Sequence, residues 1–391
     1  PIRQLLEKHM KPNPDHEKKM INLGLGEPSK ANGFTIPSVI NEAIIEVIQS
    51  ETANGYTQAC GALPARAAVA KKFSTEEYPI NPDHVILGFG CSGALYNAMA
   101  VLCERGTRVL VASPGFPLAR PICENLGVEY DTYKLLPEKQ WEIDLDDLVS
   151  KIKPETRAIL VNNPSNPCGS CFTKEHMEAI LKVADEHRLP IIADEVYYGL
   201  SYDEERPFHS FGTMTKTVPI ICTGSLSKIY CLPGWRCGWN LIYNNNGYFD
   251  KVLEGLNKHS MILLHPNTLV QMALPRILEE VPQSHFEGLS AKLKASSDVA
   301  FKRLSAIKGL TPIKSSAAMY MMVRIDKELL KDISDDIDFC KKLLAEQNCL
   351  TFPSQCFFEE GFFRMIICTT EEIINEFGDR VEEFCKAHLK E

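Results

Sequence analysis

The segment GSLSKIYCLPGWRCGW, at positions 224–239, contains the strongest candidate for a catalytic residue. Its lysine, Lys228, follows an apolar run and lies among small residues. A lysine in such a setting can form a Schiff base with a carbonyl compound if its pKa is lowered. A surface lysine in a loop is the ordinary alternative. The companions of Lys228, with Arg236 eight positions later, therefore decide between the two interpretations.

Three further segments place polar residues after predicted strands or turns. Asp194 and Tyr197 belong to ADEVY, Asn166 to VNNPSNPCG, and Arg364 to GFFR. Each segment alone is a weak signal, because an Asn-Pro turn or a buried acid is usually structural. Ligands of open α/β sheets bind outside the carboxyl ends of the strands, which is where Asp194 falls.

A glycine motif, GFGCSG at positions 88–93, follows a predicted strand and opens a predicted helix. It matches the dinucleotide fingerprint, which also needs an acid about 20 residues later to bind the ribose. No Asp or Glu lies between Glu104 and Glu124, so we reject dinucleotide binding. The backbone N–H groups and the Ser92 hydroxyl could still bind a phosphate at the N-terminus of the predicted helix.

Taken in order, these segments resemble the signatures of the class I aminotransferases of pyridoxal-phosphate fold type I, closest to the tyrosine aminotransferase branch. Lys228 and Arg236 match S-x-S-K with its later arginine, and the other segments match N-P-[TC]-G, D-x-x-Y and the C-terminal arginine strand. Residues 23–28 (LGLGEP) resemble the branch's N-terminal G-[DE]-P turn. The resemblance covers essentially the whole chain, with Cys231 and Cys237 as mild departures from the usual residues.

The resemblance implies pyridoxal 5'-phosphate as cofactor and assigns roles residue by residue. Lys228, Asp194 and Tyr197 would be catalytic. The substrate would be bound by Gly26, Asn166 and Arg364. The implied cofactor-binding residues are Lys228, Gly90, Cys91, Ser92, Phe116, Asn166, Asp194, Tyr197, Ser225, Arg236 and Tyr56.

Two aromatic residues have special places in this resemblance. Phe116, in the turn PGFP, would stack on the pyridine ring. Tyr56 would reach into the neighbouring subunit's site and touch the phosphate there, which implies a homodimer with shared active sites. Many relatives carry a further tyrosine three residues after the stacking ring, where this chain has Ala119.

Strand and helix alternate through the middle of the chain. Short β-branched runs predict strands at 84–87, 108–112, 157–161, 189–193, 218–222 and 238–243, and helical spacing predicts helices at 93–104 and 173–187. After about residue 280 the pattern changes to that of an α+β unit. Helices are predicted at 284–308 and 337–346, and strands at 319–325 and 363–368.

This pattern predicts an α/β protein with a mostly parallel sheet covered on both faces; the resemblance implies seven strands. We expect a large cofactor-binding domain at 45–280. An N-terminal arm (1–44) and residues 281–391 would make up the smaller α+β domain.

The composition argues against several classes of protein, among them nucleic-acid-binding and membrane-spanning proteins. The 391 residues carry 42 Lys and Arg against 51 Asp and Glu, a net charge of −9 that argues against nucleic-acid partners. No apolar run approaches the ~20 residues of a membrane span, and the N-terminus lacks a signal-type apolar core. Fourteen thinly spread cysteines favour reduced thiols and a cytoplasmic location. The Cys168–Cys171 pair lacks further ligands, so we expect no metal site.

The predicted function is transfer of the amino group of an aromatic amino acid, tyrosine or phenylalanine, to a 2-oxo acid such as 2-oxoglutarate, by a ping-pong mechanism. Residues 259–268 contain no arginine that could bind a distal carboxylate, which favours neutral or aromatic side chains. An alanine or broad-range aminotransferase, a pyridoxal-phosphate lyase or cyclase, and a non-catalytic regulator remain as alternatives. The acidic charge and the intact Lys228 argue against the regulator.

Overall fold

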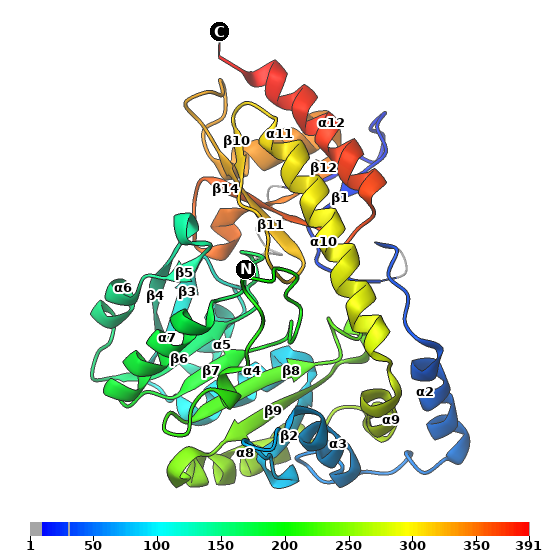
Figure 1. The fold of residues 1–391 in the computed structure, drawn as a ribbon, viewed down its shortest axis with the longest axis vertical. Coiled ribbons are helices and arrows are strands. Elements are labelled where there is room, and N and C mark those ends of the chain that lie inside the picture. Colours follow the sequence, from blue (N-terminus) through cyan, green and yellow to red (C-terminus); the bar gives the residue numbers. More distant parts are fainter. Residues whose placement is uncertain (1–9, 30–31, 391) are drawn as a thin grey trace.

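The computed structural model describes residues 10–29 and 32–390, and a large central sheet dominates its lower half (Figure 1). The strand order is β2-β9-β8-β7-β6-β3-β4-β5. The strands are β2 (Val85–Phe89), β3 (Arg108–Ser113), β4 (Glu129–Leu136), β5 (Glu142–Ile143), β6 (Thr156–Asn162), β7 (Ile191–Asp194), β8 (Ile220–Ser225) and β9 (Cys237–Tyr243). Five neighbouring strands, from β8 to β4, run parallel, while β2, β9 and the two-residue edge strand β5 pair antiparallel.

The sheet is buried on both faces, which explains why its sequence shows apolar runs and little alternation. Every residue of β7, β8 and β9 is buried. Successive residues point to opposite faces: Ile191 and Ala193 join one core cluster, whereas Ile192 joins the other together with Leu95 and Met99 of the helix α4 (Gly90–Leu102). The predicted mostly parallel α/β architecture is confirmed. The sheet has eight strands and not the expected seven, because the two-residue strand β5 pairs with the end of β4.

A second, antiparallel sheet lies above the first in Figure 1. Its order is β10-β11-β14-β13, with β10 (Leu310–Pro312), β11 (Tyr320–Ile325), β13 (Phe352–Pro353) and β14 (Phe362–Ile366). The long helix α10 (Gln283–Ser305) contacts α12 (Glu371–His388), and α11 (Asp336–Gln347) contacts β13 and β14. The short strand β1 (Ile21–Asn22) pairs with β12 (Cys349–Leu350) and so attaches the N-terminal segment to this region.

The helix α7 (Lys174–Glu186) illustrates how the local sequence fixes an element. The Thr173 hydroxyl caps its first turn by accepting from the His176 N–H at 3.3 Å. Met177, Ile180 and Ala184 fall on one face and are buried, as the helical spacing predicts. The helices α4, α10 and α11 likewise begin and end within a few residues of the predicted boundaries.

The remaining helices and 3₁₀ turns are distributed over both regions. They are α2 (Ser38–Ser50), α3 (Leu63–Phe73), α5 (Ala119–Leu126), α6 (Leu145–Ser150), α8 (Asp250–Leu263), α9 (Thr268–Glu280) and the 3₁₀ turns η2 (Pro82–His84), η3 (Pro137–Lys139), η4 (Phe211–Thr213), η5 (Pro233–Trp235), η6 (Asn245–Gly247) and η7 (Ser354–Phe357). Within the described ranges, no helix combines the length and apolarity that crossing a bilayer requires. All fourteen cysteines are free thiols.

Candidate active site

A cavity of about 560 Å³ lies at the carboxyl ends of the central strands and is closed from the other side by the small sheet. Its lining comes from segments that are far apart in the sequence. Ten of the residues singled out by the sequence line it: Gly26, Cys91, Ser92, Phe116, Asn166, Asp194, Tyr197, Lys228, Arg236 and Arg364.

Lys228 lies in the loop that follows β8 and is half-buried. Its Nζ donates a hydrogen bond to the carbonyl oxygen of Gly26 at 2.6 Å, which brings the N-terminal turn over the lysine. Gly26 has no room for a side chain, because a Cβ would lie 2.3 Å from the hydroxyl oxygen of Tyr320. This close approach explains why glycine is needed there.

Asp194 is the last residue of β7, and its buried carboxylate lines the cavity. Burial raises the pKa of this carboxyl, while hydrogen bonds from Cys91, Val196 and Thr223 act in the opposite direction. No salt-bridge partner lies near it among the described residues. The site therefore holds an acid that lacks a cationic partner.

Tyr197 reaches across the cavity wall to the small sheet. Its hydroxyl shares a hydrogen bond with that of Tyr320 at 2.7 Å, and the two rings pack edge to face. Burial raises the pKa of Tyr197, and Tyr320 adds to the effect. Tyr320 was missed in the sequence, where it is one more aromatic residue at the start of a predicted strand. Only the packing of the two sheets brings it to the site.

Arg364 on β14 is buried and wedged among aromatic rings. Its Cζ lies 4.4 Å from the ring centre of Tyr320, with Phe352 and Phe357 on its other sides. One nitrogen donates to Asn166 Oδ1 at 2.9 Å, and another donates to the Gly24 carbonyl. Nε has no partner among the residues that the structure describes. Burial lowers the pKa of this guanidinium, and no carboxylate of the described residues pairs with it.

The opposite end of the cavity is built for an anion. The helix α4 begins at Gly90 and directs its free N–H groups toward the cavity, where Ser92 also lies. The exposed guanidinium of Arg236 donates to the carbonyls of Phe89 (3.2 Å) and Pro233 (2.9 Å). A Cβ on Gly90 would come within 2.6 Å of Arg236, so the glycine permits this contact.

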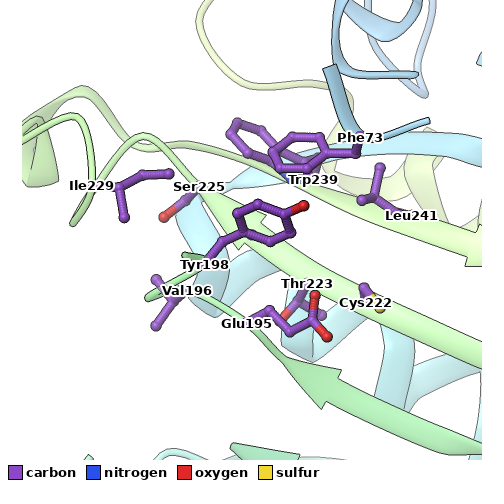
Figure 2. A pocket seen from close by; sticks show the side chains of 11 residues that line it. Phe73, Glu195, Val196, Tyr198, Cys222, Thr223, Ser225, Ile229, Trp239 and Leu241 are labelled. Carbon is purple, nitrogen blue, oxygen red and sulfur yellow. The ribbon is translucent and has the colours of Figure 1, made fainter. Parts of the chain in front are cut away.

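Three predicted residues do not line the cavity: Gly90, which lies next to the lining residue Cys91, and Ser225 and Tyr56, which lie elsewhere. Ser225 lines a much smaller space behind the strand ends, beside Tyr198 and Trp239 (Figure 2). Its hydroxyl accepts a hydrogen bond from the N–H of Ser227, and Ser227 lines the main cavity instead. Tyr56 is 90% exposed and does not touch the cavity of its own chain.

Comparison with known proteins agrees with this geometry. Residues 18–381 match the family described as aminotransferase class I and II. The chain belongs to this family. It is 39% identical to a tyrosine aminotransferase of Mus musculus over 99% of this chain and 85% of that protein. It is 30% identical to an S-alkyl-thiohydroximate lyase of Arabidopsis thaliana over 96% of this chain and 82% of that protein.

The structure of a tyrosine aminotransferase from Leishmania infantum superposes with a TM-score of 0.94 at 29% identity, covering 99% of this chain and 96% of that one. In this aminotransferase Ala119, which stands where many relatives carry a tyrosine, is the first residue of α5 and is buried. Phe116 lies nearby at the rim and is 38% exposed.

Part of the cavity lining is apolar. Leu25, Leu118, Leu350 and Phe352 contribute to it, and none of them was singled out in the sequence. The cations that line the cavity within the described residues are Lys228, Arg236 and Arg364. The cavity of this aminotransferase therefore combines apolar surface with three separate cationic side chains.

Proposed function

We propose that this aminotransferase uses pyridoxal 5'-phosphate to move the amino group of an aromatic L-amino acid, tyrosine or phenylalanine, to a 2-oxo acid such as 2-oxoglutarate in a ping-pong reaction. The observation that carries the proposal is Arg364. A buried guanidinium without an anionic partner is costly, and an amino acid's carboxylate is a partner that could enter the cavity and pair with it.

The cavity residues fit the cofactor's chemical groups. The phosphate would lie at the N-terminus of α4 against Ser92 and Arg236, with the backbone of Gly90 and Cys91 around it. Asp194 would accept a hydrogen bond from the protonated pyridine nitrogen and so keep that proton in place, and Phe116 would stack on the ring. Asn166 and Tyr197 would donate to the phenolic oxygen. Ser225 would support the phosphate through the Ser227 turn.

When bound, the cofactor supplies an electron sink that lets a proton leave the amino acid's α-carbon. Lys228 would anchor the cofactor at its Nζ and later act as the base and then the acid that moves this proton. The carbonyl of Gly26, at 2.6 Å, holds the lysine nitrogen inside the cavity. Arg364 would hold the substrate carboxylate by two parallel hydrogen bonds and so orient the α-carbon, with Gly26 and Asn166 beside it.

The preference for aromatic donors is supported by the lining of the cavity. Leu25, Leu118 and Phe352 offer apolar contacts, and the described lining has no cation left for a distal carboxylate. Residues 259–268, where a partner subunit's arginine would otherwise come from, contain none. A 2-oxo acid with two carboxylates would then be bound chiefly through its α-carboxylate.

We also propose a homodimer with shared active sites, in the cytoplasm. Tyr56 and the apolar side chains of residues 261–264 are exposed, with Ile262 exposed by 73%, and a second copy of the chain would cover them. Tyr56 would then reach the neighbouring phosphate. The free thiols favour a reducing compartment. We assign residues 45–280 to a large cofactor-binding domain and residues 1–44 with 281–391 to the smaller one.

A second candidate function is lyase chemistry, favoured by the similarity to the Arabidopsis lyase. The same lysine, aspartate and arginine would serve both reactions, so the fold alone does not separate them. Product release without a 2-oxo acid would identify a lyase. An alanine or broad-range aminotransferase differs only in its preferred donors.

The test is a donor panel on the cofactor-saturated protein with 2-oxoglutarate. We expect kcat/KM for tyrosine and phenylalanine to exceed that for aspartate by about 10²-fold or more, since a second carboxylate would be left unpaired. Parallel double-reciprocal lines would support the ping-pong order. Equal turnover of aspartate, with no activity toward aromatic donors, would contradict the proposal.

A further inference from the structure

The carboxylate of Asp194 is held through only one of its two oxygens. Oδ1 accepts hydrogen bonds from the Val196 N–H at 3.3 Å, the Cys91 thiol at 3.3 Å and the Thr223 hydroxyl at 3.4 Å. Oδ2 has no hydrogen-bond or ion-pair partner within residues 10–29 and 32–390. Because Asp194 lines the main cavity, Oδ2 is the oxygen left for a group inside it.

The two side-chain donors come from different elements. Cys91 is the second residue of α4, and Thr223 lies on β8 directly across from Asp194 of β7 in the sheet register. The Cys91 sulfur and the Thr223 hydroxyl also contact each other at 3.2 Å. Rotation of the carboxylate about its Cβ–Cγ bond would break these contacts together, so they fix where both oxygens point.

We infer that Cys91 and Thr223 are positioning residues that hold Oδ1 of Asp194 so that Oδ2 faces the ring nitrogen of the cofactor. The inference rests on the proposed function and adds a role for two side chains beyond it. The sequence led us to expect the Cys91 backbone near the cofactor phosphate. Its thiol instead contacts Asp194, which would face the nitrogen of the pyridine ring.

Several charged and titratable groups surround this cluster. Arg236 acts on Cys91 from the anion end, and Glu195 and Tyr197 follow Asp194 along the chain. Lys228 lines the same cavity. Burial raises the pKa of the Cys91 thiol, and the Asp194 carboxylate raises it further, so the thiol remains a protonated donor at neutral pH.

The first test measures the dissociation constant of pyridoxal phosphate from apoenzyme by fluorescence quenching. We expect Cys91→Ala and Thr223→Val each to weaken binding by about threefold to tenfold, the loss of one modest hydrogen bond. Cys91→Ser and Thr223→Ser keep a donor and should restore the affinity. Cys60→Ala is the matched control, because Cys60 is half-buried like Cys91 but does not line the cavity.

The absorption spectrum of the bound cofactor supplies a second readout that a merely structural role would not move. We expect the pH at which this spectrum changes to shift in Cys91→Ala and Thr223→Val and to return in the serine variants. A shift of equal size in Cys60→Ala would overturn the inference.

The second test uses apoenzyme alone and so does not depend on the cofactor. In Asp194→Asn the negative charge beside Cys91 is gone, and we expect iodoacetamide to label Cys91 about threefold to tenfold faster at neutral pH. Peptide mapping by mass spectrometry distinguishes Cys91 from the other thiols. Unchanged labelling would show that thiol and carboxylate are not coupled and would overturn the inference.

The two proposals fail in different ways. If Asp194→Asn weakens cofactor binding but Cys91→Ala and Thr223→Val do not, the positioning roles are wrong and the proposed function stands. If Asp194→Asn itself leaves the cofactor affinity unchanged, the proposed role of Asp194 is wrong, and the inference fails with it.

Discussion

Asp194 and Glu195 are neighbours at the end of β7, yet their carboxylates lie in two contrasting regions. Asp194 faces the main cavity and keeps one oxygen without a partner. Glu195 faces the interior behind the strand ends (Figure 2), where Ser210 and the Phe211 N–H donate to its two oxygens, each at 2.8 Å. Both acids are buried, so burial alone does not distinguish the functional group.

Two buried arginines show the same contrast. Arg66, in the interior, donates to the carbonyls of Gly61 and Pro82 and pairs with Asp83. Arg364, in the cavity, has an unpartnered Nε and no ion pair within the described residues. The interior charges of Glu195 and Arg66 are satisfied by the chain itself, as buried groups usually are. Asp194 and Arg364 each keep an atom without a partner in the described residues, which distinguishes these two cavity charges from the interior pair.

The largest expected effect comes from Arg364→Met, which removes the buried guanidinium from the cavity and leaves a side chain of similar volume. We expect kcat/KM for tyrosine to fall by about 10²–10³-fold, because the substrate carboxylate loses its partner. The free energy of unfolding of the apoenzyme should stay within about 1 kcal/mol of the parent or rise, since an unpaired buried charge is removed.

The matched control is Arg66→Met in the interior. Removing this arginine should lower the free energy of unfolding by about 1–3 kcal/mol, because the Gly61 and Pro82 carbonyls lose their donor. No selective change in KM for the amino acid is expected. Urea denaturation and steady-state kinetics measure both quantities. If the two variants behaved alike, the contrast between cavity and interior would be lost.

A smaller effect is expected at the exposed end of the cavity. Arg236→Gln should weaken cofactor binding by about tenfold to a hundredfold, the range for a hydrogen bond to a charged group. At saturating cofactor the KM for tyrosine should not change. Because Arg236 is exposed, the difference from the parent should shrink as salt is added; equilibrium titration at low and high salt measures it. A higher KM for the amino acid with unchanged cofactor affinity would contradict the assignment of Arg236 to the cofactor and not to the substrate.

The sequence predicted the residues that chemistry requires and missed those that only packing selects. Lys228, Asp194 and Asn166 could be found because each follows an apolar strand in a short motif, and parallel strands bring their carboxyl ends together. Tyr320 reaches the site because two sheets separated by long stretches of chain pack together, which no local pattern encodes.

Ser225 and Cys91 show the limit at the level of single side chains. Ser225 is the last residue of β8, but the direction of its hydroxyl, toward the Ser227 N–H and away from the main cavity, depends on the turn geometry. Cys91 was expected for its backbone, and its thiol contact with Asp194 follows from how α4 lies against the sheet. The strand β4 was not predicted, because it lies beside the two-residue edge strand β5 and several of its residues are partly exposed.

The smallest effect on activity is expected from Glu195→Gln in the interior, where pH-dependent stability is the readout. Burial raises the pKa of Glu195 from 4.5 to about 7. The folded protein then holds its proton more tightly than the unfolded chain, so this stabilising contribution is present below pH 4.5 and lost as pH rises to about 7.

Over that window the parent should lose roughly 2–3 kcal/mol that Glu195→Gln does not lose, as measured by urea unfolding at several pH values. Turnover at saturating tyrosine should stay within about twofold of the parent, because Glu195 does not line the main cavity. Equal pH slopes in both proteins, or a large loss of turnover in the variant, would show that Glu195 is not a purely interior group.

The central claim is that the amine of Lys228 binds pyridoxal phosphate covalently inside the cavity. The most direct measurement is borohydride reduction of the cofactor-saturated protein, followed by peptide mapping of the modified side chain. The account predicts a visible absorption band that disappears on reduction and a single pyridoxyl group on Lys228, with neither in Lys228→Ala. A protein that shows no such band, or a modification that maps to another lysine, would contradict it.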